Sequence, residues 1–494
     1  MRDSAKRTLS QGQRVLLLAA ALLAVAGIII DAWHVVLTTV ALMMIFQLGF
    51  VGSKLVAMCA ASSYNPRPYE LIPDDELPRY TTLHPMYKEA NMIPLVIGAM
   101  EALNYPKDKL QCLLVLEERD PETIAAARRA KARGELPEYF EIVVVPAAKP
   151  YGKPKACNYT LLEAAGEYAV IFDAEDRPDP DQLRKAVYAF RNGGEDLGCV
   201  QAPLVFENQR TTWVSRFLGN EYSVHFGIIL RGMSKLGLIL PLGGTSNHFP
   251  MRVLHDVQIP REVMPDALGI PAWDPYNVTE DADLGYWLRF FGYRTTMFDS
   301  WTNEEAPLTV VAAFNQRTRW IKGYAQTAAV LLRQPVEHIK RVGFFRYLNF
   351  QLTVGGTFLS LLMAPIFWSL TVAYFTLQPQ FIIELFPLPL FYTGMVLMLA
   401  GNLLVLYVSL VAALRSGVYS SVRYLVLLPV WWMVLSVAAY TSLLELVFPA
   451  WRPTWNKTAH GVVHVPLWRR IAESVSSRLP VGRPVPEKVK VYVD

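Results

Sequence analysis

Carboxylates end two short apolar runs in the middle of the chain. Glu117 and Glu118 follow the first run, and Asp173, Glu175 and Asp176 follow the second. Carboxylates that meet in one crevice repel one another and need a cation, and such hard oxygen ligands suit Mg²⁺ or Mn²⁺ bridging phosphate oxygens. Acidic residues also cap helices, which is the commoner use of such a cluster taken alone. Metal binding therefore needs support from other residues.

A further acidic pair, Glu280 and Asp281, precedes a helix-like run at Leu284–Phe291. Acidic residues at a helix start often do no more than complement the helix dipole. Trp273 and Asp274 lie just upstream, however, and an indole near a carboxylate is typical of a sugar-binding neighbourhood. The pair therefore favours a functional interpretation over capping alone.

Gln316, Arg319 and Trp320 share one face of a predicted helix, because residues at i, i+3 and i+4 lie on the same side. An amide, a guanidinium and an indole on one face can hold a diphosphate and stack on a sugar ring. The rival interpretation is a helix in the membrane interface whose Arg and Trp side chains reach the headgroups.

These candidates lie in a stretch, residues 80–332, that alternates strand-like and helix-like runs. Alternating units predict a mainly parallel sheet with helices on both faces, and ligands of such sheets bind beyond the carboxyl ends of the strands. The acidic residues follow strands at that edge. The predicted strands are Tyr80–Met86, Gln111–Leu116, Glu141–Val145 and Tyr168–Phe172, and the predicted helices are Ala90–Leu103, Pro121–Arg133 and Asn158–Ala165.

The flanks of this stretch are apolar. The 494-residue chain is 52% hydrophobic and 18% charged, whereas soluble domains carry about 25% charged residues. This composition argues against a disordered chain, a disulfide scaffold and a wholly soluble enzyme, and a net charge of +4 suggests no nucleic-acid partner. The apolar blocks, most of them long enough for a bilayer span, are Val15–Ile30, Ala32–Ser53, Tyr347–Ile383, Leu385–Leu414 and Tyr424–Leu444.

Basic residues orient the chain. Lys and Arg are frequent at the N-terminus and in the tail but absent from residues 347–414, which predicts a cytosolic globular stretch. Block 424–444 has basic residues at both ends and Pro429 early in it, so we expect it to be re-entrant or interfacial. Four true spans are expected, with five as the alternative. The predicted parts are a transmembrane hairpin (1–63), a cytosolic domain (64–332), a membrane region (333–450) and a cytosolic tail (451–494).

The ordered motifs resemble the membrane-integrated family-2 glycosyltransferases, the group of cellulose and hyaluronan synthases. The resemblance runs from Thr81 to Lys322 and includes the flanking membrane helices. One such motif is weak evidence, but this ordered series between membrane helices is specific. The motifs are Pro85-Met86-Tyr87-Lys88-Glu89, Glu117-Glu118, Lys153-Pro154-Lys155-Ala156-Cys157-Asn158 for Lys-x-x-Ala-x-Asn, Asp173-Ala174-Glu175 for Asp-x-Asp, Thr279-Glu280-Asp281, and Gln316-Arg317-Thr318-Arg319-Trp320 for Gln-x-x-Arg-Trp.

The resemblance implies an α/β domain of the glycosyltransferase-A type inserted between transmembrane helices, and a processive, inverting reaction. A nucleoside diphosphate sugar, most often a UDP-sugar, would extend a β-linked polysaccharide that leaves through the protein's own channel. Asp281, beside Glu280, would be the general base, and Mg²⁺ or Mn²⁺ on Asp173 and Glu175 would stabilise the leaving diphosphate. Further implied contacts are Tyr87, Glu89, Glu117, Glu118, Lys155, Asp173, Gln316 and Arg319 for the donor, and Trp320, Gly244, Thr245 and His248 for the acceptor.

The chain also departs from the family's pattern. Glu stands in place of Asp at positions 117, 118 and 175, which lengthens each ligand, and Asp176 could share a metal. Asn247-His248-Phe249 and Asn303–Pro307 resemble a subgroup of bacterial exopolysaccharide synthases, so we expect a location in the bacterial inner membrane. Trp455–Gly461 resembles a gating segment, with binding of lipid headgroups as the alternative.

Two other functions stay open from the sequence. One is a non-processive transferase that adds a single sugar to a lipid carrier, which the Gln-x-x-Arg-Trp motif disfavours. The other is a membrane transporter or receptor with a nucleotide-sensing domain, which the intact Thr-Glu-Asp motif disfavours. The helices predicted over Trp213–Lys235 and Pro307–Leu332 would seat the globular domain at the membrane.

Overall fold

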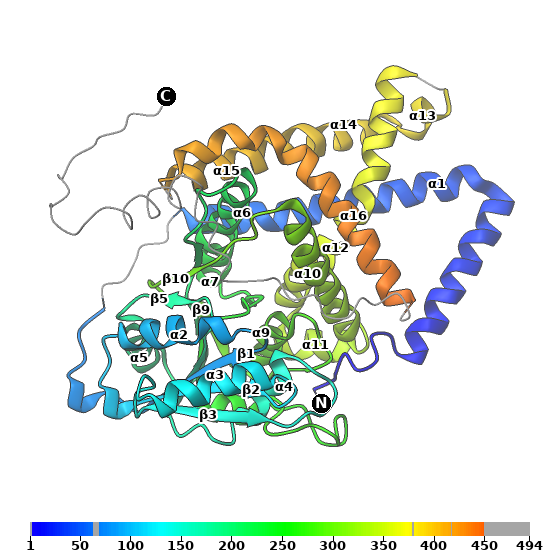
Figure 1. Cartoon of the computed structure of the whole chain (residues 1–494). Helices are drawn as coiled ribbons and strands as arrows, with labels where there is room; N and C mark the ends of the chain where they lie inside the picture. Colours follow the sequence, from blue (N-terminus) through cyan, green and yellow to red (C-terminus); the bar gives the residue numbers. More distant parts are fainter. Residues whose placement is uncertain (1, 63–68, 378–379, 416, 449–494) are drawn as a thin grey trace, which may run out of the picture. The chain divides into compact units, whose positions relative to one another are not determined.

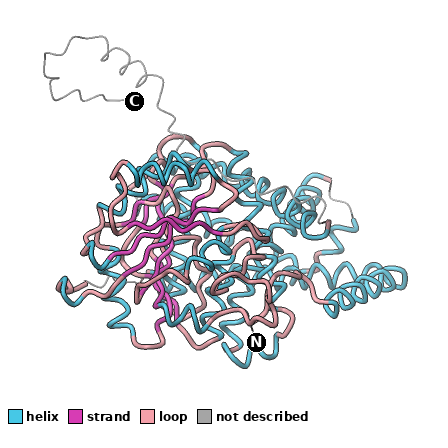
Figure 2. Tube along the Cα trace, turned by 60° about the horizontal axis from the view of Figure 1, so that its bottom comes forward, coloured by secondary structure: helices cyan, strands magenta, loops and turns pink. Residues whose placement is uncertain are grey.

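The computed structural model describes residues 2–62, 69–377, 380–415 and 417–448 (Figure 1). A seven-stranded sheet in the order β3-β2-β1-β4-β8-β6-β9 forms the centre of the globular part (Figure 2). β8 runs antiparallel to both neighbours, and the other described pairings of this sheet are parallel. The strands are β1 (Tyr80–Met86), β2 (Leu110–Glu117), β3 (Phe140–Val145), β4 (Tyr168–Ile171), β6 (Leu197–Gln201), β8 (Asn247–Pro250) and β9 (Arg294–Met297).

Helices cover both faces of this sheet, so its central strands are buried on both sides. β2 shows the two-residue period, because Leu113 and Val115 belong to one buried cluster and Cys112 and Leu114 to the other. The mainly parallel α/β architecture predicted from the sequence is therefore confirmed. The helices of this part are α2 (Ile93–Glu101), α3 (Pro121–Ala132), α4 (Lys153–Thr160), α5 (Gln182–Gly193), α8 (Met251–Asp256) and α9 (Glu280–Phe290).

Several details of this part differ from the sequence-based expectation, and the strands β6, β8 and β9 of the main sheet were not predicted. The helix predicted over Asn158–Ala165 is misplaced, since α4 begins at Lys153. Gly152 has φ +134°, a backbone conformation that favours glycine, and Pro154 lies in the first turn of α4, where proline is favoured. These two residues fix the start of α4 at Lys153. A second sheet, β5 (Arg177–Pro178), β10 (Thr302–Glu304) and β7 (Leu204–Phe206), was not predicted.

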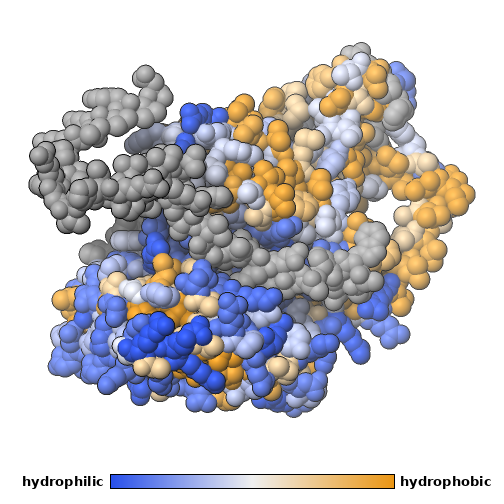
Figure 3. All heavy atoms as spheres, in the orientation of Figure 1, coloured by the Kyte–Doolittle hydropathy of each residue, from blue (hydrophilic) through white to orange (hydrophobic). Residues whose placement is uncertain are grey.

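Four helices among the described residues are long and apolar enough to cross a membrane. They are α1 (Gln11–Ala61), which contains non-helical dihedrals at Asp31, α12 (Phe344–Thr376), the run Leu388–Arg415 formed by α14 (Leu388–Val396), a π-helical turn and α15 (Asn402–Arg415), and the run Tyr419–Val447 that ends in α16 (Leu428–Val447). Apolar side chains gather over these helices and polar ones over the sheet (Figure 3).

Pro429 does not break the fifth apolar block. It lies in the first turn of α16, where proline is tolerated because its missing N–H has no helical partner to lose. The block therefore lies in a helix of spanning length, so Pro429 gives no reason to treat it as re-entrant. The tail over 451–494 and the Trp455–Gly461 segment lie outside the described residues.

Two long helices join the sheet to the apolar helices. The chain is helical from Trp213 to Lys235, through α6 (Trp213–Val224), a π-helical segment and α7 (Arg231–Lys235), and α10 spans Val310–Leu331. α10 packs against α12 and α16. Ser442 Oγ donates a hydrogen bond of 2.8 Å to the Thr318 carbonyl, and Lys322 pairs with Glu445 at 2.8 Å. The helix with the Gln-x-x-Arg-Trp motif is thus fixed to an apolar helix.

Candidate active site

The loop after β4 presents Asp173 at the carboxyl edge of the sheet. Its amide donates a hydrogen bond of 2.7 Å to Asp176 Oδ2, and the Thr245 hydroxyl donates to the same oxygen, so the loop forms a closed turn. The Asp173 carboxylate pairs with Lys153 at the start of α4, and the Lys153 ammonium also donates at 2.7 Å to the carbonyl of Gly244. Lys153 thereby links three segments.

The first turn of α9 brings the second acidic pair to the same place. A Cβ added to Gly244 would lie 3.5 Å from Asp281 Oδ2 and 3.9 Å from Lys153 Nζ. Asp281 Oδ1 accepts a hydrogen bond of 2.7 Å from the Ala282 amide. Asp173 and Asp281, which the sequence separates by more than a hundred positions, therefore surround one lysine.

Burial gives these carboxyls unusual proton affinities. Desolvation raises the pKa of Asp281 to about 6, against the opposing effects of the Ala282 amide and Lys153. Desolvation and the neighbouring Asp281 raise the pKa of Glu280 to about 8. A carboxyl whose pKa lies near 6 is ionised at neutral pH and is a stronger base than an ordinary aspartate.

α10 adds a guanidinium and an indole. Burial lowers the pKa of Arg319, and the carboxylates that oppose this change are Glu280, Asp173 and Asp281, so Arg319 lies in their field. The Trp320 ring is held by the Arg317 guanidinium, 4.3 Å from its centroid. The Gln316 side-chain oxygen is buried and has no hydrogen-bond partner among the described residues.

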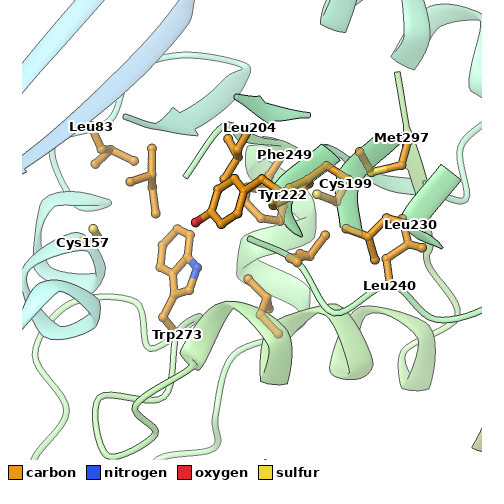
Figure 4. Packing of buried hydrophobic residues seen from close by; sticks show 14 of the residues in the cluster. Leu83, Cys157, Cys199, Leu204, Tyr222, Leu230, Leu240, Phe249, Trp273 and Met297 are labelled. Atoms are coloured by element: carbon orange, nitrogen blue, oxygen red, sulfur yellow. The ribbon is translucent and has the colours of Figure 1, made fainter. Parts of the chain in front are cut away.

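Glu304, at the end of β10, is a member of this site that the sequence did not single out. Burial and the charge of Asp173 raise its pKa to about 8, and it accepts a hydrogen bond from the Tyr222 hydroxyl. Figure 4 shows Tyr222 in the buried cluster, with its hydroxyl directed to the side where Trp273 and Leu83 lie. The only local signal was the position of Glu304 in the Asn303–Pro307 run.

The carboxyl ends of β1 and β2 form a neighbouring subsite. The Arg119 guanidinium lies 4.2 Å from the ring centroid of Tyr87 and 4.2 Å from that of Tyr151. Glu117 fixes this arginine through a bond of 2.7 Å to its Nε, and the Lys155 ammonium lies 4.0 Å from Glu117. Two aromatic rings and two cations are suited to a base and a phosphate.

Two more predicted donor contacts lie nearby. Glu89 accepts a bond of 3.4 Å from the Tyr87 amide, and its charge acts on Glu175. Glu118 is exposed, and its Oε2 accepts a bond of 2.8 Å from the Ala147 amide. Both positions lie beside the Tyr87–Arg119 subsite, as expected of residues that follow β1 and β2.

The structure does not bring His248 to these carboxylates. The ring is fully buried on β8, where one nitrogen lies 2.6 Å from the Tyr80 hydroxyl and the other 3.2 Å from Gln182 Oε1. Both ring nitrogens thus have partners inside the domain and the ring is buried, so a local hydrogen-bond role replaces the predicted acceptor contact. Thr245 is also buried and uses its hydroxyl to hold Asp176.

The acidic cluster has the chemistry that a divalent cation requires. Burial and repulsion from Asp173 raise the pKa values of Glu175 and Asp176 well above the ordinary range, and Asp176 Oδ1 is buried without a partner among the described residues. No three His, Cys, Asp or Glu side chains in the described ranges form a ready-made metal cage. Mg²⁺ commonly takes one or two carboxylates and completes its shell with substrate phosphates and water, so Asp173 and Glu175 fit a shared metal–diphosphate site.

Comparisons with known proteins agree with this arrangement. The model of the glycosyl transferase family group 2 matches residues 168–444, and that of glycosyl transferase family 2 matches residues 83–250. A probable glycosyltransferase, YdaM, of Bacillus subtilis is 27% identical over 52% of this chain and 58% of its own. The beta-monoglucosyldiacylglycerol synthase of Synechocystis is 24% identical over 53% and 52%.

The chain spans about half the length of the curated relatives it matches. Another is the probable glucomannan 4-beta-mannosyltransferase 3 of Oryza sativa, 26% identical over 49% of this chain and 42% of its own. Among solved structures, a mannosyltransferase from Pyrobaculum calidifontis in complex with GDP-Man and Mn²⁺ is 20% identical, with a TM-score of 0.53 over 84% of this chain and 99% of its own. This likeness identifies the fold as glycosyltransferase-A type.

Proposed function

The chain belongs to the glycosyl transferase family group 2, and from that premise we propose that it is an inverting, metal-dependent hexosyltransferase acting at a membrane surface. The donor is a nucleoside diphosphate sugar, and the acceptor is a sugar hydroxyl. The observation that carries the proposal is the shared position of Asp173, Lys153 and Asp281.

The reaction is a single displacement at the anomeric carbon. Asp281 accepts the proton of the acceptor hydroxyl while that oxygen forms a bond to the anomeric carbon. The bond from this carbon to the diphosphate oxygen breaks, and its electron pair leaves with the diphosphate. Attack from the opposite side inverts the configuration, so an α-linked donor gives a β-linked product.

Cations stabilise the leaving group. Lys153 and Arg319 lie beside Asp173 and would face the diphosphate as negative charge develops on it. A divalent metal held by Asp173 and Glu175 would supply further Lewis-acid stabilisation of the diphosphate. The Tyr87–Arg119–Tyr151 stack would receive the base.

We further propose a polysaccharide as the product. Trp320 lies on the helix that is fixed to α16, so a sugar stacked on it would lie next to the apolar helices. Four helices of spanning length would provide the path that a polar chain needs across hydrocarbon. Synthesis and export would then be coupled at the bacterial inner membrane, with the sheet domain in the cytosol.

A glycolipid product is the second candidate. It is favoured by the similarity to a beta-monoglucosyldiacylglycerol synthase, whose name describes transfer to a lipid. The same Asp281 chemistry would serve a lipid hydroxyl. Sizing of the radiolabelled product separates the two, because a polymer gives a ladder and a glycolipid gives one organic-soluble species.

The central test is Asp281→Asn in the purified full chain. Loss of the base should lower turnover by about a thousandfold, whereas donor affinity should change little, because Asp281 acts on the acceptor. Isothermal titration calorimetry with the intact nucleoside diphosphate sugar measures donor binding. Transfer of a radiolabelled sugar measures turnover. Turnover close to wild type in this variant would overturn the assignment.

The sugar is tested with a panel of donors. UDP-glucose, UDP-N-acetylglucosamine, UDP-galactose and GDP-mannose are offered separately to membranes that contain the protein, with Asp281→Asn membranes as the matched control. The proposal requires transfer from at least one donor that the control does not support. Equal incorporation in both membranes would exclude catalysis by this chain.

A further inference from the structure

The segment that precedes the first apolar helix is buried in the sheet domain. Residues 2–7, called the N-terminal strap below, enter this domain before the chain turns into α1 (Figure 1). The side chain of Arg2 is fully buried, which is rare for arginine, and Ser4 and Ala5 are also buried. Three residues of the strap, Arg2, Ser4 and Ala5, therefore lie in the interior of the sheet domain.

Arg2 reaches the catalytic helix. Its guanidinium donates to the carbonyls of Val257 and Ala272, the latter at 2.7 Å, and to Asp283 Oδ2 at 3.3 Å. Asp283 lies two positions after Asp281 in the first turns of α9 and is itself buried. The Arg2 side chain thus links α9 to the backbone at Val257 and at Ala272.

The strap also holds the loop that leads into α9. Asp274 accepts a hydrogen bond of 3.0 Å from the Ser4 hydroxyl and one of 2.6 Å from the Ala5 amide. The buried carboxylates on both sides of the Thr279-Glu280-Asp281 motif are therefore bound by the same segment.

The third attachment is to the end of α10. Arg333 pairs with Asp3 and donates to the carbonyls of Ser4, at 3.2 Å, and Arg7. Gln13, in the first turn of α1, donates at 2.8 Å to the Ala329 carbonyl of α10. The strap thus contacts the elements that carry Asp281 and Arg319 and continues directly into the membrane-type helix.

Stability alone is a weak reason for such a buried ion pair. The desolvation of two charges offsets most of their attraction, and apolar replacements are often as stable. A planar guanidinium that bonds three groups on three segments does, however, fix their mutual geometry. Displacements of about 1 Å at a reacting group can lower rates about a hundredfold.

We propose that Arg2 is a positioning residue of the transfer reaction, which sets the first turn of α9, and thereby Asp281, through Asp283. This inference rests on the proposed function of Asp281. Arg2 acts on the acceptor side of the reaction, because its own contacts are to Val257, Ala272 and Asp283 and none of them is to the Tyr87–Arg119 subsite.

The test compares Arg2→Met, Arg2→Lys, Asp283→Asn and the double variant Arg2→Met/Asp283→Asn in the full chain. Lys6→Gln is the matched control, because Lys6 lies in the same strap but forms an exposed pair with Asp266. Turnover is expressed per folded site, counted by nucleotide binding. Hydrogen exchange of peptides that cover 279–290 reports on α9 without relying on activity.

We expect Arg2→Met to lower kcat about tenfold or more while the donor KM stays within about twofold. Arg2→Lys should retain part of kcat, since it keeps the charge but cannot make all three contacts. The double variant should be no slower than Arg2→Met, because Arg2→Met already removes the bond between Arg2 and Asp283. Exchange in α9 should rise in Arg2→Met and Asp283→Asn and remain unchanged in Lys6→Gln.

Wild-type kcat per folded site in Arg2→Met would overturn the positioning role, whether or not α9 exchanges faster. If that variant does not fold, Arg2→Lys and Asp283→Asn decide by the same criterion. A wild-type protein that transfers no sugar would refute the proposed function instead. In that case the hydrogen-exchange data still test whether Arg2 holds α9 through Asp283. Unchanged exchange of α9 in both Arg2→Met and Asp283→Asn would refute that role as well.

Discussion

Asp281 should impose an acid limb on the rate. Its pKa is raised to about 6 by burial, and a protonated carboxyl cannot accept the acceptor's proton. Below about pH 6, kcat should therefore fall about tenfold per pH unit, while above it the base is ionised and this limb ends. Initial rates at saturating donor measure the profile.

Nucleotide binding over the same pH range is the control for this profile, because it shows that the site stays folded. A rate that is constant from neutral pH down to about pH 5 would contradict the role of Asp281 as base.

The acidic cluster around Asp173 should make activity depend on a divalent cation. EDTA should abolish transfer and Mn²⁺ or Mg²⁺ should restore it, because the clustered carboxylates and the donor diphosphate need positive charge. Asp173→Asn should remain inactive at any metal concentration, whereas the exposed Glu135→Gln should respond as wild type. Full activity after exhaustive chelation would speak against the metal site.

Candidate site residues can be recognised from the sequence where they end strands or begin helices. Asp173, Glu280 and Asp281 were found because strand ends and helix starts have local patterns. The lysine that pairs with Asp173 was harder to identify. The resemblance implied Lys155 as the donor contact, but α4 begins at Lys153, and it is Lys153 that pairs with Asp173. Arg2 was out of reach, because its partner lies 281 positions away.

At the level of elements, the crossing of α9 and α10 depends on a glycine. A Cβ added to Gly323 would lie 2.6 Å from the Thr279 backbone nitrogen, so Gly323→Ala must push α10 from the start of α9. We expect kcat to fall about tenfold or more, because Arg319 and Trp320 move away from Asp281. Transfer assays per folded site measure this effect.

Gly98→Ala is the matched control for this change. Gly98 is an exposed position of α2, and no described atom lies within 4 Å of its added Cβ. Activity should remain at the wild-type level, and stability should rise by about 0.5–1 kcal/mol from helix propensity. Equal activities of Gly323→Ala and Gly98→Ala would show that the close crossing is not needed.

Long elements were predictable and short ones were not. β1 has the predicted bounds Tyr80–Met86, and this run lies in a stretch without Asp, Glu, Lys or Arg that is bounded by Arg79 and Lys88. The strands β5, β7 and β10 have two or three residues each, too few to show a period, and they pair only because distant segments meet. β10 nevertheless positions Glu304, so this part of the site could not be read from local pattern.

For the whole molecule, hydrogen bonds and an ion pair link the elements of the site to the apolar helices. The strap connects α1 to α9 and α10, while Ser442 and Glu445 connect α16 to α10. The sequence predicted the separate blocks from charge and hydropathy, but not these links, since each joins residues far apart in the chain. If the product is the proposed polysaccharide, a transferase built in this way holds its acceptor next to the apolar helices.

Trp320 should therefore control product length rather than donor use. Its ring is fixed on α10 by Arg317 and lies 6.1 Å from that of Tyr222, and loss of stacking with a sugar should let a growing chain dissociate sooner. We expect Trp320→Ala to shorten the product severalfold at unchanged nucleotide affinity, and Trp320→Phe to keep most of the length. Gel sizing of radiolabelled product measures both. Products of equal length in Trp320→Ala and wild type would contradict an acceptor role for this ring, and a single glycolipid in all three proteins would favour the lipid acceptor instead.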